Sequence, residues 1–172
     1  MGYTHYWRTS TNGIPKNQWK AICEDVIALI TNLPEHSTSA GGYHATDPLE
    51  IAWEHDKPNR PPEISSEVIR FNGKDGENDL GHETFYFERH PKKEEWERGD
   101  DPSVFAFCKT AGKPYDLIVC GALIVAAKHA SEYVKVSSDG EVSDWKPALK
   151  WVKSVLGQDY DIPLAEDKTH AM

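Results

Sequence analysis

One stretch of the chain is almost wholly apolar, and it restricts the folds that are open to the protein. The longest apolar run extends from Leu117 to Ala127 and follows Pro114, which fits the first turn of a helix because the amide it lacks would be unpaired there. We predict a helix from Pro114 to about Ser131. A helix that is apolar on all sides is buried on all sides, and this run is too short to cross a bilayer. The sequence therefore predicts a central helix surrounded by the rest of the domain.

The remaining elements are predicted from hydrophobic spacing and from turn residues. We expect strands at Tyr3–Thr9, Leu49–Trp53, Glu67–Asn72, Glu83–Glu88, Val104–Lys109 and Val134–Ser137, a helix from Pro15 to Leu33, and a helix from Trp145 to Leu156 capped by Gly157. Short turns between successive strands indicate antiparallel pairing. The fold class is thus α+β, a mainly antiparallel sheet of about five strands packed against two or three helices. We expect a single domain over residues 1–157 and an acidic, loosely ordered C-terminal tail over residues 158–172.

Composition limits the partners of this 172-residue chain. The formal net charge is −9, and residues 34–102 carry 8 Lys and Arg against 17 Asp and Glu. This balance argues against duplex nucleic acid as a partner, because duplex binding relies on basic surface. The three cysteines show no zinc-binding or redox spacing and are interpreted as reduced, buried thiols. With no signal-peptide pattern at the N-terminus, we expect a cytoplasmic protein without membrane contact.

The turn between the fifth strand and the apolar helix is a candidate anion site. Lys109 and Lys113 lie beside the start of a helix, where free N–H groups and the helix dipole favour negative charge. Lys109, Thr110, Lys113 and the amides before Tyr115 are predicted to hold a phosphate. A nucleotide-hydrolysing P-loop is excluded, because Pro114 stands where Ser or Thr is required. The alternative is an ordinary strand–helix turn with solvated lysines.

The first strand is a second candidate. Alternation places His5 and Trp7 on one face and Tyr6 and Arg8 on the other. A ring and a guanidinium on an open face suit a stacked base and a phosphate, so we assign Tyr6 or Trp7, together with Arg8 and Asn72, to the base or ribose of a ligand. The alternative is an ordinary sheet strand with aromatic residues at its edge.

Catalytic and metal motifs are weak. The chain has neither a GxSxG motif nor an HExxH motif, so we predict no catalytic residue, no metal ligand and no cofactor. His82 and Glu83 could join other histidines in a metal site, but their spacing does not support one.

Several short pieces of the chain form one pattern. They are Met1–Trp7, Ile69–Gly73, Glu83–Phe85, Phe107–Thr110, Lys113–Asp116 and Ser138–Gly140 followed by Trp145. Together they resemble a family of small, uncharacterised proteins of tailed phages and prophages, which open with Met-Gly-Tyr-Thr-His-Tyr-Trp. The resemblance implies a phage origin and the cytoplasm of a bacterial host, and it implies no reaction. Small phage proteins of this kind often act against host defences.

Three functions remain open. The first is a phage-encoded, non-catalytic binding protein that counteracts host antiviral defence by sequestering a small anionic, nucleotide-derived signal. The second is an acidic inhibitor that binds a host defence protein through the stretch Glu83–Asp101. The third is an enzyme that modifies nucleotides, with His5, Glu83 or Asp116 as acid or base. A homo-oligomer is compatible with each.

Overall fold

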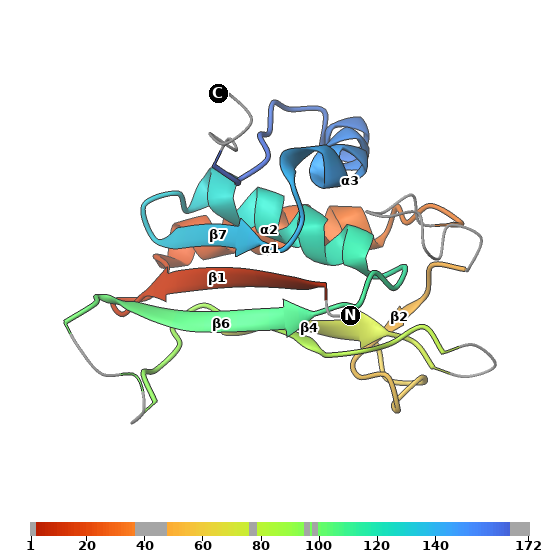
Figure 1. The fold of residues 1–172 in the computed structure, drawn as a ribbon, viewed down its shortest axis with the longest axis horizontal. Coiled ribbons are helices and arrows are strands. Elements are labelled where there is room, and N and C mark those ends of the chain that lie inside the picture. The colour runs from red at the N-terminus through yellow and green to blue at the C-terminus, as the bar shows by residue number, and fades with distance from the viewer. Residues whose placement is uncertain (1–2, 37–47, 76–78, 95–96, 98–99, 166–172) are drawn as a thin grey trace.

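The computed structural model describes residues 3–36, 48–75, 79–94, 97 and 100–165, and these form three helices and seven strands (Figure 1). The helices are α1 (Lys16–Ile30), α2 (Asp116–His129) and α3 (Val142–Leu156), and the strands are β1 (Thr4–Ser10), β2 (Ile51–Ala52), β3 (Glu63–Ile64), β4 (Val68–Gly73), β5 (Phe85–Glu88), β6 (Ser103–Lys109) and β7 (Val134–Ser138). All strand pairs among the described residues are antiparallel. The predicted α+β class is therefore confirmed. β3 was missed because it follows the prolines of a segment that the sequence marks as irregular.

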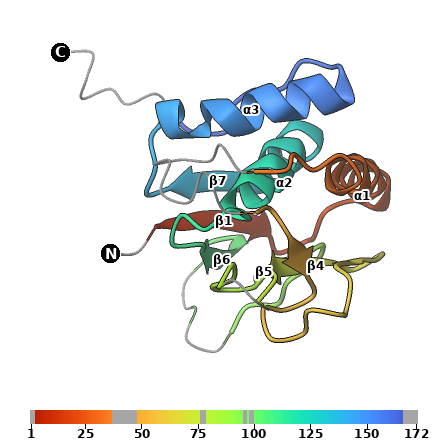
Figure 2. The same ribbon diagram turned by 90° about the vertical axis from the view of Figure 1, so that its right-hand side faces the viewer.

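The apolar helix occupies the centre of the molecule, as predicted. Every residue of α2 from Asp116 to Ala126 is buried. α1 and α3 both pack against α2, and Figure 2 shows α2 between them, with the strands covering its remaining side. Burial of so much apolar surface is the main stabilising contribution to such a fold. Within the described part of the chain, no helix has the length and apolar character needed to cross a membrane.

The strands form a three-stranded sheet in the order β6-β1-β7 and a four-stranded sheet around β4. In the first sheet, β1 is central and its side chains alternate between a buried and an outer face. His5, Trp7 and Thr9 point into the core and are at most 2% exposed. Tyr6 and Arg8 point the other way, opposite Phe107 and Phe105 of β6. In the described part of the chain, no helix covers this outer face (Figures 1 and 2).

The two sheets meet between β5 and β6. At one end of β6, the Glu83 amide donates to the Lys109 carbonyl at 3.1 Å, and the Lys109 amide donates to the Glu83 carboxylate at 2.7 Å. Further along β6, the Phe105 amide donates to the Glu97 carboxylate at 3.2 Å. The carboxylates of Glu83 and Glu97, both from the stretch Glu83–Asp101, thus accept hydrogen bonds from β6 amides that would otherwise pair with a neighbouring strand. Residues 95, 96, 98 and 99 of the stretch Glu83–Asp101, Trp96 among them, lie outside the described residues.

The described part of the C-terminal segment is packed against the domain, so the predicted loose tail is wrong there. α3 ends as expected at Gly157, which adopts a φ of +67°. Tyr160 is then 1% exposed and donates its hydroxyl to Asp25 of α1 at 2.8 Å. Ile162 and Leu164 pack against the core, so residues 158–165 belong to the domain. Residues 166–172 of the predicted tail lie outside the described residues.

Candidate functional site

The turn before α2 directs its amides inward. Thr110 and Ala111 both donate to the Tyr3 carbonyl, at 3.0 and 3.2 Å, and the Lys113 and Asp116 amides donate to carbonyls within the turn. Two successive residues, Ala111 and Gly112, adopt positive φ values of 55° and 71° and reverse the chain direction. These amides are not available to a phosphate, which removes the main physical reason for an anion site here.

The start of α2 contains an anion of the protein itself. Asp116 is fully buried in the first turn, where a carboxylate is stabilised by the positive end of the helix dipole. Its Oδ1 lies 2.6 Å from His5 Nε2 and accepts the Thr110 hydroxyl at 2.6 Å. Thr110 is therefore a partner of Asp116 in the core, and not the exposed phosphate ligand that we predicted.

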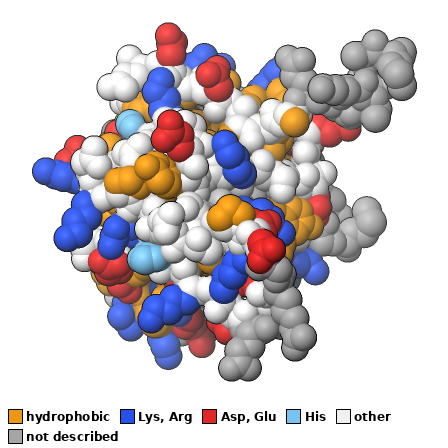
Figure 3. All heavy atoms as spheres, turned by 90° about the vertical axis from the view of Figure 1, so that its left-hand side faces the viewer, with side chains coloured by type: hydrophobic (Ala, Val, Ile, Leu, Met, Phe, Trp, Pro, Cys, Tyr) orange, Lys and Arg blue, Asp and Glu red, His pale blue; other side chains and the backbone are white. Residues whose placement is uncertain are grey.

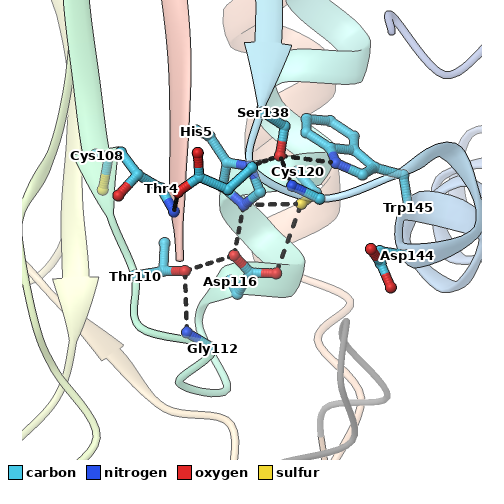
Figure 4. Close-up of polar contacts among 12 residues, drawn as sticks. Thr4, His5, Cys108, Thr110, Gly112, Asp116, Cys120, Ser138, Asp144 and Trp145 are labelled. Atoms are coloured by element: carbon cyan, nitrogen blue, oxygen red, sulfur yellow. Dashed lines mark hydrogen bonds and ion pairs between the residues drawn. The ribbon is translucent and has the colours of Figure 1, made fainter. Parts of the chain in front are cut away.

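His5 connects Asp116 to β7 (Figure 4). Its Nδ1 lies 2.8 Å from Ser138 Oγ, so Ser138, His5 and Asp116 follow one another in the order found in Ser-His-Asp hydrolases. However, Ser138 Oγ also accepts the Gly140 amide at 2.9 Å and the Trp145 indole N–H at 3.4 Å. These two donors use both lone pairs of the hydroxyl when its proton points to Nδ1. Ser138 is thus bonded as a structural anchor, with no lone pair left for nucleophilic attack.

Two more protonated groups adjoin this cluster. Cys120, one helical turn after Asp116, places its Sγ 3.5 Å from His5 Nε2 and 3.6 Å from Asp116 Oδ2. Burial, and then the Asp116 charge, raise the pKa of the Cys120 thiol well above its ordinary value. The same two causes raise the pKa of the Tyr3 hydroxyl. Both groups therefore keep their protons at neutral pH.

The outer face of β6-β1-β7 carries aromatic and cationic side chains. The Tyr6 ring stacks on Phe105 with centroids 6.0 Å apart, and Phe105 lies 6.0 Å from Phe107. The Arg8 guanidinium lies 5.2 Å from the Phe105 centroid, close enough for a cation–π contact. Phe107 is 54% exposed. We call these four residues, Tyr6, Arg8, Phe105 and Phe107, the aromatic face.

Lysines border the aromatic face. Lys109 pairs with Thr4, and Lys135 pairs with Arg8, in the registers that place them on the outer side of the sheet. Arg8 contacts Asp101 at 3.4 Å in an exposed ion pair, which contributes little to stability. Lys113, in contrast, donates to the Asp79 carbonyl at 2.8 Å and its side chain is only 17% exposed. The two lysines predicted to act together therefore have different environments.

The structure brings only part of the predicted site together. Tyr6, Arg8 and Lys109 share the outer side of one sheet. Four other predicted residues are at most 2% exposed and cannot contact a ligand at the surface, namely Trp7, Asn72, Thr110 and Tyr115. Trp7 packs against Phe85 and Phe87, and the Tyr115 hydroxyl donates to the Glu83 carbonyl at 2.5 Å. Of the alternatives Tyr6 and Trp7, the geometry leaves Tyr6.

Two groups of residues were not recognised as groups from the sequence, although His5 and Asp116 were each named there as a possible acid or base of an enzyme. Phe105 and Phe107 were interpreted only as apolar strand residues, although their spacing of two places both on one face. Asp116 and Cys120 are four residues apart and share a helix face, but their partner His5 is 111 residues away from Asp116 in sequence. The first group had a local signal, whereas the second depended on the folded topology.

Comparisons with family models, with curated proteins and with solved structures found no match to this chain. The fold and the site therefore define its class directly. It is an α+β protein in which an antiparallel sheet presents an aromatic and cationic outer face, with a polar cluster buried behind it.

Proposed function

We propose that this protein is a binding protein that captures a small anionic, nucleotide-like ligand on the aromatic face. The observation that carries the proposal is the row of two half-buried rings, Tyr6 and Phe105, and one exposed ring, Phe107, with Arg8 over the Phe105 ring. Every nucleobase has a π-face that stacks on such rings, and arginine pairs with phosphate. Large apolar side chains are seldom as exposed as Phe107: among the described residues, Ile27 and Tyr86 are the others with a comparable exposure.

The charge distribution favours a small ligand over a duplex. Arg8, Lys109 and Lys135 supply positive charge on the outer side of the sheet, although the whole chain has a formal charge of −9. A phosphate that binds Arg8 competes with Asp101, whose pKa is lowered first by its hydrogen bond to Ser103 and then by Arg8 among other groups. On the face shown in Figure 3, acidic and basic side chains alternate without forming a large basic field. A long polyanion gains little from such a surface.

Binding without turnover agrees with the state of the buried cluster. The one Ser-His-Asp arrangement among the residues discussed has its serine oxygen fully hydrogen-bonded. Its histidine and aspartate are 0% exposed. The proposed role against a host antiviral defence is drawn from the resemblance to phage proteins and is a separate part of the proposal. The acidic-inhibitor alternative loses support, because Glu83 and Glu97 already bond amides of β6.

A titration with a panel of mononucleotides and cyclic dinucleotides tests the proposal. We expect Phe107→Ala to weaken binding by about 5- to 150-fold, since stacking on one ring contributes about 1–3 kcal/mol per base. Arg8→Ala should weaken only the phosphate-bearing members of the panel and leave the free nucleosides unchanged.

Two matched variants, each outside the aromatic face, control for effects on affinity that do not come from this face. Ile27→Ala removes a 47%-exposed apolar side chain from α1, and Lys153→Ala removes an exposed cation from α3. Both should bind like the wild type. If no member of the panel binds, or if the controls lose as much affinity as the two test variants, the aromatic face is not a nucleotide site.

A further inference from the structure

Three side chains in the buried cluster carry atoms that bind metal ions. His5 Nε2, a carboxylate oxygen of Asp116 and Cys120 Sγ all lie within 4.8 Å of one another, and all three residues are buried. They come from β1 and from one face of α2 (Figure 4). Among the described residues, this is the one group of histidine, cysteine or acidic side chains that meets such a criterion. Imidazole, carboxylate and thiolate together form a donor set that zinc accepts.

Two of the three distances in the cluster match those around a zinc ion. With bonds of about 2.0 Å to nitrogen or oxygen and about 2.3 Å to sulfur, a tetrahedral zinc separates sulfur from either of the other atoms by about 3.5 Å. Cys120 Sγ lies 3.5 Å from His5 Nε2 and 3.6 Å from Asp116 Oδ2. The contact of 2.6 Å between Nε2 and Oδ1 is a hydrogen bond, and it would lengthen to about 3.3 Å when the metal replaces its proton.

Hydrogen-bond partners of His5 and Asp116 already orient these side chains in the way that such partners orient metal ligands. Metal-binding histidines use their second nitrogen for a hydrogen bond, and ligating carboxylates are also hydrogen-bonded. Here Ser138 contacts His5 Nδ1 at 2.8 Å, which directs Nε2 towards Asp116 and Cys120. The Thr110 hydroxyl bonds the Asp116 carboxylate at 2.6 Å. His5 and Asp116 therefore each already have a hydrogen-bond partner that fixes their orientation.

We propose that His5 Nε2, the Asp116 carboxylate and Cys120 Sγ bind one zinc ion in the core of this protein, a site distinct from the aromatic face. One carboxylate and one thiolate neutralise the two charges of the ion, and a neutral cluster is the form that a buried site tolerates best. Three protein ligands leave the fourth position to a water or to the Thr110 hydroxyl.

Proton transfers accompany the binding. The Cys120 thiol loses its proton to solvent. The His5 proton moves from Nε2 to Nδ1 and is donated to Ser138 Oγ, which turns its own proton away from Nδ1 and gives up the 3.4 Å contact with the Trp145 indole N–H. Zinc binding therefore releases one proton for each ion, and the affinity should increase with pH.

Metal content and cobalt spectroscopy test the site. The purified chain is treated with a chelator, dialysed, and given Zn²⁺ or Co²⁺ at pH 7.5. We expect about one ion per chain by mass spectrometry, a higher melting temperature with zinc, and a thiolate-to-cobalt charge-transfer band. Cys120→Ser should abolish the band, and Cys108→Ser should retain it. Cys108 is a matched control, because it is also 0% exposed but bonds the Glu83 carbonyl at 3.5 Å.

The wild-type measurement decides the question even if Cys120→Ser does not fold. A wild-type chain that keeps its melting temperature, retains no stoichiometric zinc and gives no cobalt band would overturn the proposal. Loss of the band in Cys108→Ser as well as in Cys120→Ser would also contradict it. Phe107→Ala should bind zinc normally, so failure of the nucleotide site and failure of the metal site are distinguishable.

Discussion

Asn72 shows how a residue typical of a ligand contact can be used entirely inside the fold. It is 0% exposed, and its Nδ2 donates to the His82 carbonyl at 2.9 Å and to Thr84 Oγ1 at 3.1 Å. Its Oδ1 accepts the amides of Gly73 and His82. Two donors and two acceptor positions are all that an amide side chain has. Asn72 therefore has no group left for a base or a ribose.

We predict that Asn72→Ala destabilises the protein by about 3 kcal/mol, because buried backbone groups of Gly73 and His82 lose their partner. Urea unfolding measures the change. The control is Lys74→Ala, which removes a side chain that is 37% exposed and 4.0 Å from Glu50 and should change stability by less than about 0.5 kcal/mol. Equal effects in the two variants would contradict the structural role of Asn72.

The choice between Tyr6 and Trp7 shows what alternation can predict. The sequence pattern correctly separates the two residues onto opposite faces of β1, because side chains alternate along any strand. It does not indicate which face the helices cover, since that depends on α2, which begins at Asp116, far along the chain. The structure buries Trp7 against Phe85 and Phe87 and leaves Tyr6 on the outer side.

At the scale of elements, α3 contains a residue with a very low propensity for the interior of a helix. Pro147 lies inside α3, where it cannot donate to the carbonyl four residues earlier and its ring disturbs the preceding turn. The helix persists because Trp145, Ala148 and Val152 are buried against the rest of the molecule and because Glu141 and Asp144 form a capping box. Tertiary packing therefore outweighs local propensity in α3.

Replacing this proline should stabilise the protein. We expect Pro147→Ala to raise the free energy of unfolding by about 2 kcal/mol, which is the helix penalty of proline reduced by its ordering of the unfolded chain. Lys150→Ala, at an exposed position of the same helix, should have almost no effect. A loss of stability in Pro147→Ala would instead show that the proline ring packs in the groove that it lines with Leu117 and Trp151.

The start of α2 marks the limit of element-level prediction. Its apolar composition was enough to predict a central buried helix, because no other environment accommodates such a surface. Whether the amides of the preceding turn are free depends on which groups lie opposite them in the fold. The Tyr3 carbonyl accepts two of these amides, and Asp116 places a carboxylate at the helix start. The Tyr3 carbonyl becomes a neighbour of the turn only through the pairing of β1 with β6.

At the scale of the whole molecule, folding encloses several groups that are neutral at pH 7. Burial is the largest cause of the raised pKa of Tyr3, Tyr115 and Tyr160, whose ordinary value is 10.0. It is also the largest cause of the raised pKa of Cys108 and Cys120, whose ordinary value is 9.0. These groups lie on β6, on α2, and in the segments before β1 and after α3, so most of the fold depends on their remaining neutral.

This arrangement predicts a cooperative loss of stability in alkaline solution. In the unfolded chain the five groups ionise near pH 9–10, whereas in the folded chain their raised pKa values keep the protons bound. The folded state then binds more protons, so stability is fully present below about pH 9 and decreases as the pH rises further, by up to about 1.4 kcal/mol per pH unit for each group. Urea midpoints of chelator-treated protein between about pH 8 and pH 11 measure this loss.

Tyr115→Phe provides the matched variant for this prediction. It removes one buried ionisable group, together with the 2.5 Å hydrogen bond to the Glu83 carbonyl, so the variant should be less stable at pH 8 but lose stability less steeply above pH 10. Tyrosinate absorbance should reach its full value only as the chain unfolds. If all tyrosines ionised while the circular dichroism remained native, or if the slope of Tyr115→Phe matched the wild type, burial of neutral groups would not control the alkaline limit of this fold.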